Sequence, residues 1–167
     1  MYGICNLLLL ADQEIEALIA EPKKMKCSPG DLLDLKSAQG HVGKTVDIDG
    51  ADEHRFKLII RRSNFNVLDF SAILGFVLPN NVVFRLRRYN GKSHQHRNSI
   101  EGTAPFYDFH IHYATTRYQQ VGNKDEESFA LSSDKYSDLW TAISCLVVDC
   151  NISYPNDSQL SIFEVNK

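Results

Sequence analysis

The chain is 167 residues long, with 43% hydrophobic and 23% charged side chains, and this composition excludes a disordered or fibrous protein. Its length is enough for one domain that buries its own core without disulfide or metal crosslinks. The longest apolar run, residues 7–11, is too short for a membrane span and lacks the flanks of a secretory leader. We therefore expect a cytoplasmic protein that does not bind membranes.

The four cysteines are typical of a reducing compartment. Cys5, Cys27, Cys145 and Cys150 form no CxxC pair, and no histidine lies at zinc-finger spacing from them. The last two fall in an apolar helical pattern, where a thiol acts as a small hydrophobic side chain. We expect all four to be reduced and structural.

The net charge of −3 conceals a strong asymmetry along the chain. Residues 55–98 contain nine bases and one acid, Asp69, a net charge of +8, so the rest of the chain carries −11. The bases are Arg55, Lys57, Arg61, Arg62, Arg85, Arg87, Arg88, Lys92 and Arg97. Such a segment favours a surface that binds RNA or another polyanion, framed by acidic helices and loops. Alternatively, these side chains keep the edges of a sheet soluble.

Residues 1–50 are grouped as a helical N-terminal region. A helix is predicted at residues 12–20, because its apolar side chains share one face and Pro22 follows its end. We expect a short helical turn at residues 31–35 and a glycine-containing loop before an extended segment at residues 45–48.

The hydrophobic period then changes from 3.6 to 2, which predicts an antiparallel sheet over residues 55–114. Its strands are expected at residues 56–61, 68–78, 82–89 and 106–114. Apolar side chains alternate with arginine and lysine along these strands, as in a sheet with one face exposed to water.

Residues 115–167 are predicted to form a loop, a helix and a tail. Ser132, Ser133 and Asp134 are expected to cap a helix of about 15 residues, whose apolar stripe packs on the dry face of the sheet. The predicted fold class is α+β, a single domain over residues 1–167. It comprises an antiparallel sheet of about four to five strands, with an N-terminal helix and a C-terminal helix packed on one face.

Four of the six histidines lie within 19 residues, as two HxH pairs. His94 and His96 occupy the loop between the third and fourth predicted strands. Alternation along the fourth strand puts His110 and His112 on one face, which we expect to be that of Arg85 and Arg87. An imidazole beside guanidinium groups can transfer protons while the cations hold a phosphate. RNA supplies its own nucleophile, the 2′-OH, so neither metal nor cofactor is needed.

Two other interpretations stay open. In the first, a non-enzymatic, phage- or defence-related interaction module binds nucleic acid or an acidic protein through the same sheet. Alternatively, the HxH pairs would bind a metal, and His94-x-His96 followed by Glu101 partly matches the first cupin motif. Neighbouring arginines disfavour a divalent ion, and we therefore expect that the protein has no metal site.

Residues 84–96, FRLRRYNGKSHQH, resemble TumE-like toxins of bacterial toxin–antitoxin pairs. There a strand ending in Arg-Tyr-Asp or Arg-Tyr-Asn runs into a Gly-Lys/His-rich loop with an HxH, and a terminal helix follows. The resemblance implies a RelE-type fold, ribonuclease activity and an antitoxin partner. The site residues it implies are Arg88, Tyr89, Lys92, His94 and His96. Residues 106–120 are also similar to an uncharacterised bacterial and phage family of unknown function.

The leading functional prediction is thus a toxin-like, metal-independent endoribonuclease. The residues assigned to catalysis are His94, His96, Tyr89 and Arg88. The residues assigned to substrate binding are Arg85, Arg87, Lys92, Arg97, His110, His112 and Arg117.

Overall fold

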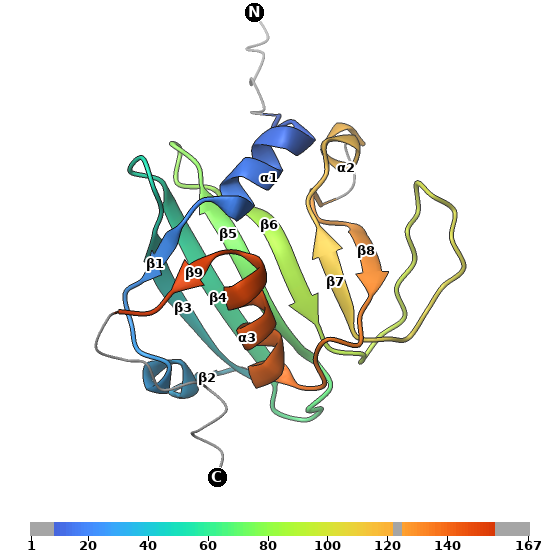
Figure 1. Cartoon of the computed structure of the whole chain (residues 1–167). Coiled ribbons are helices and arrows are strands. Elements are labelled where there is room, and N and C mark those ends of the chain that lie inside the picture. Colours follow the sequence, from blue (N-terminus) through green and yellow to red (C-terminus); the bar gives the residue numbers. More distant parts are fainter. Residues whose placement is uncertain (1–8, 122–124, 156–167) are drawn as a thin grey trace, which may run out of the picture.

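The computed structural model describes residues 9–121 and 125–155 (Figure 1). Its helices are α1 (Asp12–Ala20), the short 3-10 helix η1 (Gly30–Leu33), α2 (Thr116–Gln120) and α3 (Leu139–Asp149). Its strands are β1 (Lys23–Met25), β2 (Lys36–Ala38), β3 (His41–Asp49), β4 (Arg55–Ser63), β5 (Phe70–Val77), β6 (Val83–Asn90), β7 (His110–Tyr113), β8 (Phe129–Ser132) and β9 (Ile152–Ser153).

The strands of the described residues form one nine-stranded sheet in the order β8-β7-β6-β5-β4-β3-β1-β9, with β2 paired to β3. Neighbours are antiparallel except β1 and β9, which are parallel. The long central strands β3 to β6 follow one another along the chain through short turns, which is the usual connection between antiparallel neighbours. The sheet is therefore a meander extended at both sides by short strands.

Helix α3 packs on one face of the sheet, against β5, β6 and β9 (Figure 1). It begins at Leu139 because Asp138 caps it: the Asp138 carboxylate accepts from the Thr141 N–H at 2.9 Å. Helix α1 buries Ile15, Leu18 and Ile19 in the same core, and at its exposed N-terminus Glu14 accepts from the Ala11 N–H at 2.7 Å. The side chains with no exposed surface at the centre of this core include Leu58, Leu74, Leu86, Ile143 and Leu146.

This architecture corrects the predicted one. A sheet of four to five strands with two packed helices is wrong, because the described residues hold nine strands and their helices are short. Residues 1–50 were expected to be mainly helical, but β1, β2 and β3 lie there. These strands form because β3 pairs along its whole length with β4, which buries Val46 and Ile48.

The C-terminal helix is also shorter than predicted. Residues 129–132 join the sheet as β8 instead of leading into the helix, because each pairs with a residue of β7. The predicted cap at residues 132–134 is replaced by Asp138. In the described part of the chain, no helix is long and apolar enough to cross a membrane.

Candidate functional site

Strands β6 and β7 bring four polar side chains together on the face of the sheet opposite α3. Arg88 lies directly across from His112 in the ladder, and Asn90 lies across from His110. Residues paired in this way project from the same face. Tyr136, beneath the other face, has its hydroxyl 2.9 Å from the Asn90 carbonyl and 2.8 Å from the His110 carbonyl. It therefore holds the two strands together at the site.

A bulge in β6 decides which arginine accompanies the histidines. Gly75 pairs with Arg85 but the adjacent Leu74 pairs with Arg87, so Leu86 is an extra residue that reverses the alternation. The prediction that Arg87 shares the face of His110 and His112 is therefore wrong. Arg87 faces the other side, where its guanidinium lies 3.4 Å from the Glu16 carboxylate.

The long connection between β6 and β7 adds a third histidine. Its backbone folds back on itself, because His96 and Phe106 exchange hydrogen bonds of 2.9 Å in an isolated bridge. The His96 ring then lies 5.3 Å from the His110 ring, stacked on it, and 4.8 Å from the His112 ring. His110 and His112 are 4.9 Å apart, measured between ring centroids. Each of the three offers a ring nitrogen, and these nitrogens lie within 4.8 Å of one another.

Hydrogen bonds fix the tautomers of His110 and His112. Nδ1 of His110 lies 2.7 Å from the carbonyl oxygen of Asp108, and Nδ1 of His112 lies 2.8 Å from that of Glu127. A carbonyl oxygen only accepts, so both Nδ1 atoms carry the proton and donate. Since the neutral ring has one N–H, both Nε2 atoms keep free lone pairs.

Asn98 fixes the tautomer of His96. The Asn98 amide donates to the Ala130 carbonyl at 2.7 Å, and its Oδ1 accepts from the Ala130 N–H at 2.8 Å. His96 Nε2 lies 3.0 Å from the same Oδ1 and must therefore be the donor. Nδ1 of His96 is left with the lone pair. Asn98 thus anchors the loop to the backbone of β8 and orients His96 as well.

The site keeps its imidazoles neutral. Burial lowers the pKa of His112 to about 2 and that of His110 to about 4, and it also lowers the pKa of His96. The Arg88 cation acts in the same direction on all three pKa values. At neutral pH the cluster therefore presents three unprotonated nitrogens instead of three cations.

The charge of Arg88 is balanced by a buried carboxylate. Glu127 has no exposed side-chain surface and lies 3.4 Å from Arg88 and 3.3 Å from Arg85. Burial raises the pKa of Glu127, while the two guanidinium groups oppose that change. Asp125 adds a second, exposed contact of 3.7 Å to Arg85. The cation beside the histidines is therefore half of an ion pair and not an isolated charge.

Asn90 closes the cluster from β6. Its Nδ2 lies 3.4 Å from His110 Nε2 and 3.2 Å from His112 Nε2, so its two N–H groups point at the two lone pairs. The Asn90 Oδ1 is buried and has no hydrogen-bond partner among the described residues. An unsatisfied buried acceptor is costly and rare, which marks this amide as a position with a further role.

Other predicted site residues serve the fold. Tyr89 is fully buried, its hydroxyl donates to Asp149 at 2.8 Å, and burial raises its pKa far above the ordinary value. Arg117 donates to Glu101 at 2.7 Å and thereby ties the loop to α2. Tyr89 is closed to a substrate, whereas Arg117 is exposed but paired with Glu101.

The remaining predicted residues are more open to solvent. His94 is exposed and stands edge-on to His110, with 5.3 Å between ring centroids. Lys92 and Arg97 are also exposed, and Arg97 forms no ion pair with any described residue. His94 therefore lies at the solvent side of the cluster, outside the trio of His96, His110 and His112.

The basic segment is partly neutralised within the described residues. Five of its nine cations form ion pairs with carboxylates, most of them distant in sequence: Lys57, Arg61, Arg85, Arg87 and Arg88. Carboxylates outside the segment pair with four of these bases and Asp69, inside it, with Arg61, whereas Arg55, Arg62, Lys92 and Arg97 form no ion pair with a described residue.

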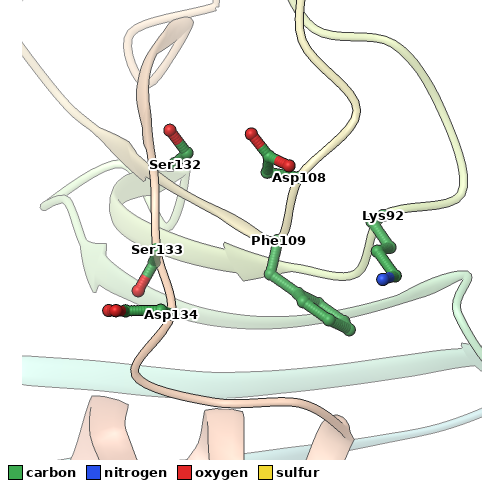
Figure 2. Close-up of a pocket in the computed structure, with 6 residues that line it drawn as sticks. All are labelled: Lys92, Asp108, Phe109, Ser132, Ser133 and Asp134. Atoms are coloured by element: carbon green, nitrogen blue, oxygen red, sulfur yellow. The ribbon is translucent and has the colours of Figure 1, made fainter.

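Figure 2 shows a surface cavity of about 520 Å³ at the same end of β7, lined by Lys92, Asp108, Phe109, Ser132, Ser133 and Asp134. The Lys92 ammonium lies 5.0 Å from the centre of the Phe109 ring. Phe109 in turn stacks on Phe70, on the α3 side of the sheet. The side chains of this cavity carry both signs of charge, which places Lys92 in a mixed environment.

Sequence reasoning missed Asn90, Asn98 and Glu127. The spacing His96-x-Asn98 was a usable signal, because an amide two residues away can orient an imidazole. Asn90 and Glu127 became visible only with the register of β6 and the packing of residues 125–128. Comparison with known protein families, curated proteins and solved structures gave no match to this chain.

Proposed function

We propose that the protein binds a divalent transition-metal ion, of the zinc class, through His96, His110 and His112. The observation that carries this proposal is the cluster of three imidazoles, each of which offers a ring nitrogen within 4.8 Å of those of the other two. Imidazole nitrogens of this kind suit zinc, cobalt, nickel and copper, whereas magnesium and calcium prefer oxygen.

The hydrogen bonds around the cluster support this proposal. In metal sites, the ring nitrogen that does not bind the ion usually donates to a carbonyl or carboxylate oxygen, which fixes the tautomer and orients the ring. Asp108, Glu127 and Asn98 supply those oxygens here. The cluster therefore supplies both the three ligand nitrogens of a three-histidine centre and the oxygen acceptors that orient the rings.

The nearby cation does not prevent binding. Arg88 would repel a dication, and repulsion by neighbouring arginines (Arg85, Arg87 and Arg97) was the reason to expect no metal. Glu127 offsets it, because its buried carboxylate contacts Arg88 directly. Glu127 also contacts Arg85, which Asp125 contacts in turn, so the formal charges of these two arginines and two carboxylates sum to zero.

Calorimetric titration of Zn²⁺ into the metal-free protein at pH 7.5 tests the proposal. We expect one ion per chain, with affinity falling at least about 100-fold in His96→Ala and in His110→Ala, since each removes a ligand. His96→Ala is the informative variant because His96 is only half-buried, on a loop. His41→Ala is the matched control, since its Nδ1 also lies near a carbonyl, at 3.1 Å, but away from the cluster. Equal binding by all variants would contradict the proposal.

RNA cleavage is a second candidate, favoured by the exposure of His94 beside Lys92 and Arg97. His94 would exchange protons with the 2′-OH or the leaving oxygen, and the two cations would bind phosphate. In this case the partners would be RNA and an antitoxin protein. Tyr89 takes no part, because it is buried.

Incubation of total RNA with the protein in excess EDTA checks this candidate. Fragmentation that disappears in His94→Ala would support a metal-independent nuclease. Intact RNA would remove it and leave metal binding as the function. We place either activity in the cytoplasm, where free thiols such as Cys27, Cys145 and Cys150 stay reduced.

A further inference from the structure

We infer that Asn90 supplies the fourth ligand of the metal, through Oδ1, after its side-chain amide turns over. The inference rests on the proposed metal site and specifies its coordination. It makes the site a closed centre of three imidazole nitrogens and one amide oxygen. Closed four-coordinate sites hold structure together, whereas catalytic sites keep one position open for water or substrate.

Distances around Asn90 carry the argument. Metal–nitrogen bonds of about 2.0–2.1 Å give a tetrahedron whose ligand atoms are about 3.3 Å apart. The terminal atom of Asn90 that faces the cluster lies 3.4 Å from His110 Nε2 and 3.2 Å from His112 Nε2. It therefore already stands at a tetrahedral spacing from two of the ligands.

The direction of the amide supports the same conclusion. In the metal-free arrangement, the amide protons satisfy the two lone pairs and leave Oδ1 buried without a partner. A metal ion would take over those lone pairs, and the amide protons would then point at a cation. Rotation of the amide by half a turn removes that conflict. It also puts the unsatisfied oxygen where the fourth ligand belongs.

The closed site would fasten the long loop to the sheet. His96 comes from the loop, Asn90 from β6, and the other two ligands from β7. The histidine nitrogens are up to 4.8 Å apart, wider than the about 3.3 Å of a tetrahedral site, so metal binding must draw the ligands together. Zn²⁺ would therefore crosslink the loop to strands β6 and β7. The loop is the segment whose backbone mobility should fall when the ion binds.

Zn²⁺ affinity of Asn90 variants tests the inference. Asn90→Asp is expected to bind Zn²⁺ about tenfold more tightly, because a carboxylate replaces a neutral oxygen. Asn90→Leu is expected to bind it about 10- to 100-fold more weakly. His94→Ala tests the exposed imidazole next to the site and should change the affinity less than about twofold. His41→Ala is the control, an imidazole away from the cluster. Hydrogen exchange at the backbone amides of residues 96–106 should slow when Zn²⁺ is added.

The outcomes separate this inference from the proposed function. Tight Zn²⁺ binding by the parent, with Asn90→Asp no tighter, would overturn the role of Asn90 and leave the three-histidine site standing. A large loss in His94→Ala would instead make His94 the fourth ligand, and the inference would again be wrong. Absence of Zn²⁺ binding by the parent would overturn both proposals. If Asn90→Leu fails to fold, the Asn90→Asp result decides.

Discussion

Lowering the pH from 7 to 5 is expected to remove about 4 kcal/mol of folding stability from the metal-free protein. The reason is the pair His110 and His112, whose folded-state pKa values are lowered by burial to about 4 and about 2. In the unfolded chain a histidine titrates near 6.5. At pH values between the folded-state pKa values and 6.5, the unfolded state binds protons at these two histidines and the folded state does not. Their contribution is therefore complete above pH 6.5 and is lost as the pH falls towards the folded-state pKa values.

Each histidine accounts for about 2 kcal/mol of the loss by pH 5, because one unit of pKa difference corresponds to about 1.36 kcal/mol. Urea unfolding in EDTA, at a series of pH values from 7.5 to 5, measures the effect. The control is His110→Gln/His112→Gln, which cannot titrate there and should show most of the slope removed, whatever its stability at pH 7. Single variants should each lose about half of it. An equally steep slope in the double variant would show that the acid sensitivity lies elsewhere.

Removal of the Glu127 carboxylate is expected to lower the free energy of unfolding by about 3 kcal/mol. The reason is that the guanidinium groups of Arg85 and Arg88 lose their buried counter-ion. Glu127→Gln keeps the shape of the side chain and removes only the ion pairs with Arg85 and Arg88. The second expected effect is on metal binding. Without Glu127 the charge of Arg88 is uncompensated, and the affinity for Zn²⁺ should fall by about tenfold or more.

Asp125→Asn is the matched control for Glu127→Gln. Asp125 contacts the same Arg85, at 3.7 Å, but its side chain is 65% exposed. Exposed ion pairs contribute little, so this variant should change the unfolding free energy by less than about 1 kcal/mol. Thermal or urea unfolding and Zn²⁺ titration of the two variants provide both readouts. Similar stabilities for Glu127→Gln and Asp125→Asn would refute the view that Glu127 is the counter-ion of the site.

Local patterns in the sequence were informative where an element is long and regular. The helix at residues 12–20 is observed as α1, and the alternation in residues 56–61, 68–78 and 82–89 corresponds to β4, β5 and β6. The number of strands was underestimated because β1, β8 and β9 are two to four residues long. Such segments carry too few alternations to identify, and pairing with distant strands forms them.

The candidate site was predictable only in part. The two HxH pairs include all three histidines of the cluster, but their spacing could not show that His96 turns inward and His94 outward. That division depends on the bridge to Phe106 and on Asn98. Nor could a count of local charge show that Arg85 and Arg88 would meet Glu127, some 40 residues away in sequence. The sequence also could not show the bulge at Leu86, which puts Arg88 on the face of the histidines where Arg87 was predicted.

Long-range ¹H–¹⁵N NMR of the histidine side chains tests the central claim most directly, because it reports the proton and the metal at each ring nitrogen. At pH 7 without metal, we predict Nδ1–H tautomers for His110 and His112 and an Nε2–H tautomer for His96. One equivalent of Zn²⁺ should shift the resonances of the other nitrogen of each ring and leave those of His41 and His54 unchanged. Protonated rings in the metal-free protein, or shifts in His41 and His54 instead, would contradict a metal centre at His96, His110 and His112.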